Sequence, residues 1–129
     1  MIRWLDHVNV RTANLEQLVR FYEDVVGMRR GPRPPLGFPG AWLYAGERAV
    51  VHLVQVEAQP QPSGALRLEH FAFAATNWPA LRERLERHGV EYRSSRQPGT
   101  GNLVVNLHDP DGNRLHVDFD ATELTSDPA

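Results

Sequence analysis

The sequence lacks several features that would assign it to particular classes of protein. None of its 129 residues is cysteine, which excludes disulfide bonds and thiol chemistry and is compatible with the cytoplasmic location that we expect. No apolar run approaches the roughly 18 residues of a membrane-spanning helix. The N-terminus has no basic segment followed by an apolar run, so we also expect no signal peptide.

The sequence also lacks an excess of charge of one sign. Its 14 Lys and Arg residues and 16 Asp and Glu residues give a formal net charge of −2, and the two signs are mixed along the chain. Such a chain offers no basic surface of the kind that binds nucleic acid or an anionic membrane. The hydrophobic residues, 41% of the total, are sufficient for the core of one compact domain.

A sequence repeat organises the chain. The segment Leu5–Val10 (LDHVNV) recurs 63 positions later as Leu68–Phe73 (LEHFAF). The segment Val51–Leu53 (VHL) recurs 64 positions later as Leu115–Val117 (LHV). An offset this constant indicates an internal duplication. We therefore predict a single domain, residues 1–129, with two modules at about 4–57 and 67–120, a linker at 58–66 and a polar tail at 121–129.

Each module has the pattern of a strand, a helix and then further strands. Alternation of apolar and polar residues predicts strands, and apolar residues spaced by three and four predict helices. We expect the first helix to begin after Asn14, with Gln17 completing a capping box, and the second to begin after Asn77. We expect Gly27 and Gly89 to end them. The predicted strands are residues 4–11, 41–44 and 49–56 in the first module and 68–74, 90–93, 103–107 and 114–120 in the second.

Four of the six histidines occupy duplicated positions in these predicted strands. Their neighbours along each strand are mainly apolar, and successive residues of a strand point to opposite faces of the sheet. The neighbours can therefore pack against the helices while the histidines face the other side. The polar set expected on that side is His7, Asn9, His52, His70, His116 and Asp118. Such a set suggests a binding or catalytic site.

These residues give the chain a resemblance to a known family. It resembles the vicinal oxygen chelate superfamily, which includes glyoxalase I, extradiol dioxygenases, and fosfomycin- and bleomycin-resistance proteins. The resemblance is most specific in Leu5–Val8, in the helix end from Phe21 to Gly27, and in Asp109–Arg114 (DPDGNR). It implies an α+β fold in which two tandem βαβββ modules form a half-open mixed β barrel with the helices outside. For a small member it also implies a homodimer.

The resemblance further implies one divalent metal ion, whose ligand positions fall on His7, His52, His70 and His116. Imidazole ligands suit Zn, Ni, Co or Fe better than Mg or Ca. His116 stands where the family usually has glutamate, so Asp118 is a candidate for an additional ligand or a base. The candidates for the substrate cleft are Asn9, Trp42, Tyr44 and Phe38, although core packing explains Trp42 and Tyr44 equally well.

The function that we expect is that of a metal-dependent enzyme. Its substrate would be a small oxygenated molecule chelated to the metal, and a lyase or isomerase is favoured over a dioxygenase. The alternative is a metal-free protein that binds and sequesters an antibiotic or toxin, as bleomycin-resistance proteins do. Metal analysis of the protein without a histidine tag would separate the two.

Overall fold

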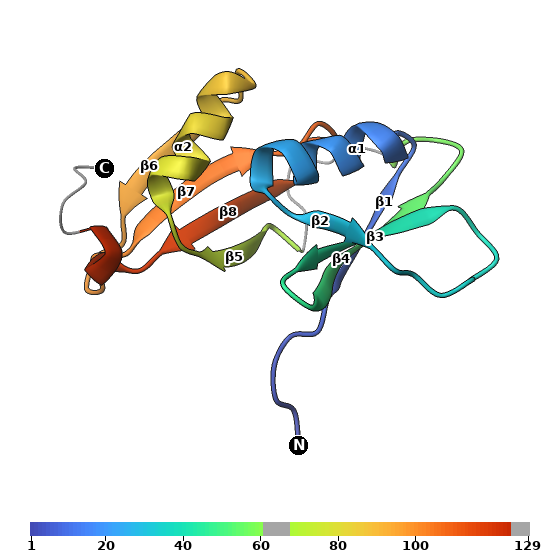
Figure 1. Ribbon diagram of the computed structural model, residues 1–129, viewed down its shortest axis with the longest axis horizontal. Helices are drawn as coiled ribbons and strands as arrows, with labels where there is room; N and C mark the ends of the chain where they lie inside the picture. The colour runs from blue at the N-terminus through green and yellow to red at the C-terminus, as the bar shows by residue number, and fades with distance from the viewer. Residues whose placement is uncertain (61–67, 125–129) are drawn as a thin grey trace. The chain divides into compact units, whose positions relative to one another are not determined.

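The computed structural model of the chain describes residues 1–60 and 68–124 (Figure 1). The chain divides into two compact units, Met1–Gln61 and Pro62–Ala129. Each unit contains its own four-stranded mixed sheet. Most of the linker predicted at 58–66 lies outside the described residues, as do residues 125–129 of the predicted tail.

The first unit has one helical region and four strands. Its elements are β1 (Val8–Thr12), α1 (Leu15–Phe21), a π-helical turn η1 (Tyr22–Val26), β2 (Arg29–Gly31), β3 (Gly40–Ala45) and β4 (Arg48–Gln55). The strand order is β1-β4-β3-β2, in which β1 and β4 are parallel and the other neighbours are antiparallel. The first and last strands of the unit therefore lie side by side, with β1 at the edge of the sheet.

The second unit repeats this arrangement. Its elements are β5 (Phe71–Ala75), α2 (Trp78–Arg87), β6 (Tyr92–Arg96), β7 (Leu103–His108), β8 (Arg114–Phe119) and a short 3-10 turn η2 (Ala121–Leu124). The strand order is β5-β8-β7-β6, again with one parallel pair, β5 and β8. The prediction of an α+β fold with two βαβββ modules is confirmed. The strands of the described residues form two separate sheets and no closed barrel.

The start of α1 differs from the prediction. Asn14 is the N-cap residue, but its side chain makes no capping hydrogen bond, so the capping box with Gln17 is wrong. Instead Gln55, at the end of β4, accepts a hydrogen bond from the backbone N–H of Leu15 at 3.1 Å. The Gln55 amide also donates to the carbonyl of Ala13 at 3.0 Å. A side chain distant in sequence thus satisfies the backbone groups that a local cap would otherwise satisfy.

The other helix boundaries follow the sequence signals. The Asn77 side chain accepts a hydrogen bond from the backbone N–H of Ala80 at 3.3 Å, as an N-cap residue does. Pro79 lies in the first turn, where its missing N–H costs nothing. Gly27 and Gly89 follow the helical regions with φ of 90° and 64°. Left-handed backbone of this kind favours glycine and ends a helix.

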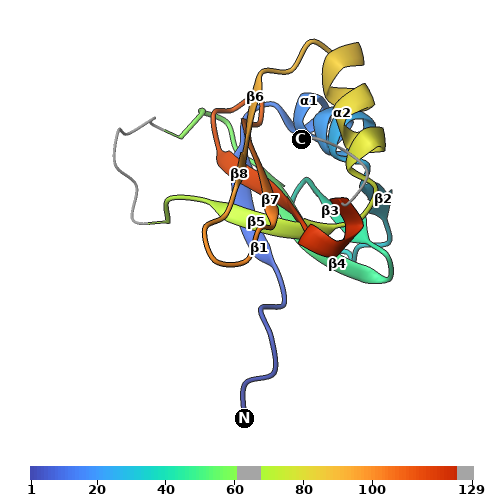
Figure 2. The same ribbon diagram turned by 90° about the vertical axis from the view of Figure 1, so that its left-hand side faces the viewer.

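One face of each sheet is packed against its helix. In the first unit Val51 and Leu53 of β4 are buried, whereas His52 between them is half-buried on the other face. In the second unit the Trp78 ring of α2 lies 5.7 Å from the Phe119 ring of β8, and Figure 2 shows α2 running along one side of its sheet. The alternation predicted for these strands is confirmed. It leaves the opposite face of each sheet to polar side chains.

The first strand of each module is shorter than predicted. The parallel ladders begin at Val8, opposite Val51, and at Phe71, opposite Leu115. Residues 4–7 and 68–70 therefore have no strand partner and precede the strands, which leaves Leu5 78% exposed. Two further elements differ from the prediction. The strand predicted at 90–93 is β6, which begins at Tyr92, and the first part of the predicted tail forms η2. No helix of the described residues is long and apolar enough to cross a membrane.

Candidate functional site

The first unit brings two of the predicted histidines into ring contact. The rings of His7 and His52 are stacked, with centroids 3.8 Å apart and planes at 12°. On its other side His52 stacks on Trp42, with centroids 4.0 Å apart and planes at 9°. Trp42 lies opposite His52 in the β3–β4 ladder, so the register of the sheet sets this contact. The His52 imidazole is thus held between His7 and an indole.

The second unit brings the equivalent pair together. The rings of His70 and His116 have centroids 4.4 Å apart and planes at 38°. The residue opposite His116 in the β7–β8 ladder is Asn106, which corresponds to Trp42. No aromatic ring is therefore available at that position to stack on His116. The duplication has conserved the histidine pairs but not their neighbours.

Three of the four histidines have a carboxylate partner at Nδ1. His7 Nδ1 is 2.8 Å from Asp6, His70 Nδ1 is 2.5 Å from Glu69, and His116 Nδ1 is 2.6 Å from Asp118. An ionised carboxylate only accepts hydrogen bonds, so Nδ1 must carry the proton in each pair. The lone pair of the neutral imidazole is then on Nε2. A carboxylate that fixes the tautomer and the ring orientation in this way is typical of metal-binding histidines.

His52 is the exception. Its Nε2 lies 3.0 Å from the carbonyl oxygen of Ala49. Since a carbonyl can only accept, Nε2 carries the proton and the lone pair of the neutral ring is on Nδ1. Burial lowers the pKa of His52, and the nearby His7 lowers it further. His52 therefore remains neutral to lower pH than an exposed histidine.

The carboxylates of the pairs are correspondingly acidic. The hydrogen bond from His7 lowers the pKa of Asp6, and the hydrogen bond from His70 lowers the pKa of Glu69. Glu69 has a second partner, because the Arg114 guanidinium donates to its other oxygen. Both carboxylates are thus ionised at neutral pH, which is the state that orients the imidazoles.

A pocket of about 360 Å³ adjoins the stacked histidine of the first unit. Its lining is rich in aromatic rings and includes Trp4, Asp6, Trp42, Tyr44, Glu47, Arg48, Ala49 and His52. The Arg48 guanidinium lies 4.0 Å from the centre of the Trp4 ring, a cation–π contact that holds the indole at the pocket. Two of the predicted cleft residues, Trp42 and Tyr44, therefore line a pocket together with His52.

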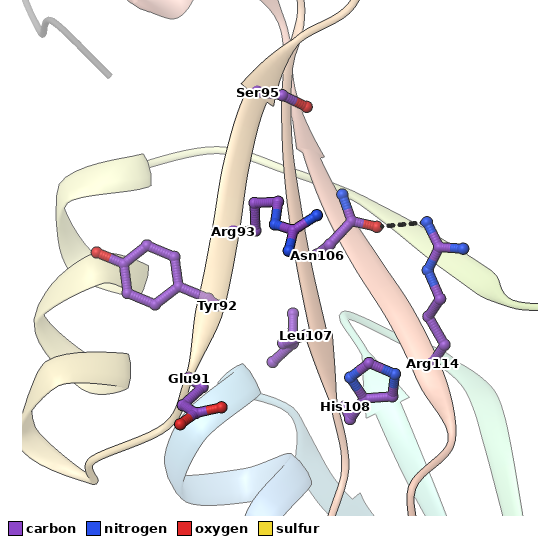
Figure 3. A pocket seen from close by; sticks show the side chains of 8 residues that line it. All are labelled: Glu91, Tyr92, Arg93, Ser95, Asn106, Leu107, His108 and Arg114. Atoms are coloured by element: carbon purple, nitrogen blue, oxygen red, sulfur yellow. Dashed lines mark hydrogen bonds between the residues drawn. The ribbon is translucent and has the colours of Figure 1, made fainter.

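A larger pocket, of about 600 Å³, lies on the second unit (Figure 3). It is lined by Glu91, Tyr92, Arg93, Ser95, Asn106, Leu107, His108 and Arg114. The guanidinium of Arg114 donates to the side-chain oxygen of Asn106 at 2.9 Å. Asn106 is the ladder neighbour of His116, so this polar pocket lies beside the second histidine pair.

The remaining predicted site residues are placed as follows. Asn9 is exposed and lies opposite His52 in the β1–β4 ladder. Phe38 lies in the loop between β2 and β3, where Arg33 covers its ring at 5.0 Å, and it is absent from the lining of the described pockets. Sequence reasoning missed the carboxylates Asp6 and Glu69. The repeated carboxylate–histidine pair could have revealed them.

Comparison with known proteins gives the family. Residues 4–117 match the sequence pattern of the Glyoxalase/Bleomycin resistance protein/Dioxygenase superfamily. The chain belongs to this superfamily. A relative from Arabidopsis thaliana, described as "Glyoxylase I 4", is 29% identical over an alignment of 120 residues that covers 88% of this chain and 68% of the relative.

Solved structures of the glyoxalase superfamily share the fold. A putative glyoxalase family protein from Bacillus anthracis has a TM-score of 0.75 and 22% identity, covering 93% of this chain and 97% of that one. A glyoxalase/dioxygenase from Nostoc punctiforme has a TM-score of 0.77 and 16% identity, covering 92% and 91%. Lactoylglutathione lyase from Agrobacterium tumefaciens has a TM-score of 0.67 and 21% identity, covering 92% and 95%. At these identities the likeness shows the fold alone.

The metal ion that the family resemblance implies fits the donor atoms of this glyoxalase-like chain. His7, His70 and His116 each have Nδ1 bonded to a carboxylate, and no hydrogen bond to Nε2 occurs among the described residues. Residues 1–60 and 68–124 contain no group of three or more His, Asp or Glu side chains placed to hold a metal. Each unit thus brings together one pair of histidines.

Proposed function

We propose that this member of the glyoxalase superfamily is a metal-dependent lyase or isomerase that acts on a small oxygenated substrate. The observation that carries the proposal is the duplicated histidine pair, in which three of four imidazoles have Nδ1 fixed by a carboxylate. The relative described as "Glyoxylase I 4" favours a lyase over a dioxygenase.

The proposed ligands of one divalent ion are His7, His52, His70 and His116. When bound, the ion would supply Lewis-acid chemistry toward the oxygens of the substrate. Catalytic zinc sites have three protein ligands. One histidine pair is therefore too few to bind the ion, and the proposal needs both pairs. We also propose that the chain is a cytoplasmic homodimer, and light scattering should then return twice the mass of one chain.

In this proposal Asp118 is the residue that accepts a proton. Its carboxylate lies 2.6 Å from Nδ1 of His116 and its side chain is 35% exposed, compared with 15% for His116. The carboxylate therefore holds the imidazole proton while it remains accessible to a bound molecule. It is the candidate base in a chain that has histidine at the position where glutamate is usual.

The test is metal content in protein prepared without a histidine tag. We expect the wild type to bind one equivalent of Zn, Ni, Co or Fe, and we expect His7→Ala and His70→Ala each to lose it. The matched control is His88→Ala, because His88 is an exposed residue at the C-terminal end of α2 and its loss should leave the stoichiometry unchanged. If His7→Ala and His70→Ala both keep full stoichiometric metal, the ligand assignment is wrong.

A second candidate function has an observation of its own. The pocket of the first unit is lined by Trp4, Trp42 and Tyr44, and aromatic walls of this kind bind planar organic molecules. This favours sequestration of an antibiotic or toxin, without metal. Quenching of tryptophan fluorescence by such a molecule in metal-stripped protein, undiminished in His70→Ala, would support sequestration over catalysis.

A further inference from the structure

The face of the second sheet that carries His116 also carries a row of hydrogen-bond donors. Arg93 of β6 lies opposite Asn106 of β7, which in turn lies opposite His116 of β8. Residues directly opposite in neighbouring strands project from the same face. The pocket of about 600 Å³ lined by Arg93 and Asn106 is therefore beside the second histidine pair. Its volume is within the range of small-molecule sites.

Internal contacts orient one of the two donors of this pocket, the Asn106 amide. Arg114 donates one amino group to the side-chain oxygen of Asn106 at 2.9 Å and the other to Glu69. Because the Asn106 oxygen is used as an acceptor, its amide nitrogen remains available as a donor. In the part of the chain that the structure describes, Arg93 has no hydrogen-bond or ion-pair partner, and Figure 3 shows its side chain directed toward Asn106. An unneutralised guanidinium thus lies beside an oriented amide.

The fold does not require this donor set. The corresponding row of the first unit is Gly31, Trp42 and His52. Val50, which precedes the buried Val51 of β4, corresponds to Arg114. The first unit thus builds the same four-stranded sheet with no charged side chain at either position. The sheet therefore does not need either arginine of the second unit for its own stability.

We propose that this pocket binds an oxyanion group of the substrate, a carboxylate or a phosphate, through Arg93 and Asn106. A guanidinium offers paired N–H donors that match two oxygens of either group. Arg114, held by Glu69, orients Asn106. The acidic residue of the lining, Glu91, is at the opposite end of the pocket from Arg114 (Figure 3), so it does not face the Asn106 amide.

The inference rests on the proposed function, because it treats the pocket and His116 as parts of one substrate site. Oxyanion binding itself needs no metal, which keeps the two tests independent. The experiment titrates metal-stripped, isotopically labelled protein with inorganic phosphate and, separately, with malonate. The readouts are the NMR signals of the Arg93 Nε–H and the Asn106 side-chain amide. The metal content of the same preparations is measured before stripping.

The variants are Arg93→Gln and the control Arg87→Gln, which removes the same charge from the exposed face of α2, where Arg87 pairs with Glu83. We expect at least one probe to bind, Arg93→Gln to weaken it about tenfold or more, and Arg87→Gln to change it less than about twofold. The probe that binds more tightly identifies the oxyanion class.

Three results would overturn the inference. The first is no binding of either probe at about 10 mM, and the second is equal weakening by Arg93→Gln and Arg87→Gln. The third is binding that shifts neither the Arg93 nor the Asn106 signal. Arg93→Gln should keep the metal content of the wild type. Failure of the metal proposal therefore appears in the metal analysis, and failure of the oxyanion site appears in the titration.

Discussion

The stack of His52 on Trp42 should contribute a measurable coupling energy. Its geometry is a close, nearly parallel contact, with ring centroids 4.0 Å apart. Aromatic pairs contribute about 0.5–1.5 kcal/mol beyond the burial of their surface. Because both rings are only half-buried, we expect about 1 kcal/mol. The perturbation is a double-mutant cycle of Trp42→Ala, His52→Ala and the combination, in which the separate burial losses cancel.

The assay is urea unfolding of the metal-stripped proteins, followed by far-UV circular dichroism. The duplication supplies a matched control pair, because Asn106 and His116 occupy the same ladder positions in the second unit without a ring contact. Their coupling should remain below about 0.5 kcal/mol. If the Trp42–His52 coupling is no larger than that of the control pair, the stack is a contact without energetic consequence and the reasoning fails.

The same substitution should change the ionisation of His52. Burial is the main cause that lowers its pKa, and Trp42 covers one face of the ring. Trp42→Ala should therefore raise the pKa of His52 toward its ordinary value, as measured by NMR titration. The sign for stability follows from proton binding: the unfolded chain binds a proton more readily than the folded one, so this contribution to stability decreases as pH falls through the ordinary histidine range. A pKa of His52 unchanged by Trp42→Ala would contradict the burial argument.

Three further predictions concern the fold and the pH response. Gln55→Ala should lower the free energy of unfolding by about 2 kcal/mol, because it removes two hydrogen bonds at the start of α1 and a third to the carbonyl of Val56. Asn14→Ala, which removes no cap, should change the free energy of unfolding by less than about 0.5 kcal/mol, and equal losses in urea unfolding would refute this. Gly40→Ala should cost about 1–3 kcal/mol in the same assay, because its Cβ would lie 2.4 Å from a backbone oxygen of β4; an unchanged midpoint would show that the strand can move. Hydrogen bonds from the Thr122 hydroxyl and backbone lower the pKa of Asp120, so the stability that these bonds contribute is lost as pH falls through that lowered pKa. Thr122→Ala should raise the pKa of Asp120 in a carboxyl NMR titration, and an unchanged pKa would argue against the hydroxyl hydrogen bond.

Sequence periodicity was sufficient to predict the fold, because the alternation of the strands and the spacing of apolar residues in the helices were both clear. The alternation around His52 and His116 predicted which face of β4 and β8 is buried, and the structure confirms it. The glycines that end the helices were also identified correctly, because left-handed backbone is a local requirement. The constant repeat offset then fixed the number of modules.

The errors arose where a partner distant in sequence decides the local structure. Asn14 has the local pattern of a capping residue, yet Gln55 supplies the hydrogen bonds. Alternation continues through residues 4–7, but a strand needs a ladder partner, and the β1–β4 ladder begins only at Val8. Tertiary contacts of this kind leave no periodic trace in the sequence.

The histidine pairs of the candidate site were predicted better than its pockets. Repetition identified the four histidines as two duplicated positions, and the structure shows that within each unit the two histidines are in ring contact, His7 with His52 and His70 with His116. Arg93, by contrast, belongs to a short strand whose pairing with β7 is known only from the structure. Trp42 and Tyr44 were identified as cleft candidates from their alternation and line the first pocket, whereas the second pocket had no such signal in the sequence.

The divergence of the duplicated units has a chemical consequence for the histidines themselves. With Trp42 beside it, His52 is stacked on both faces and donates Nε2–H to the Ala49 carbonyl, so its ring is held in one orientation with the lone pair on Nδ1. With Asn106 beside it, His116 has its Nδ1 proton held by Asp118, and its lone pair is on Nε2. Duplication alone would have produced two equivalent pairs of ligands. The two units differ instead at two neighbours, Trp42 against Asn106 and Val54 against Asp118. These differences leave one histidine constrained by aromatic stacking and one oriented by a carboxylate, which is the arrangement typical of metal-binding histidines.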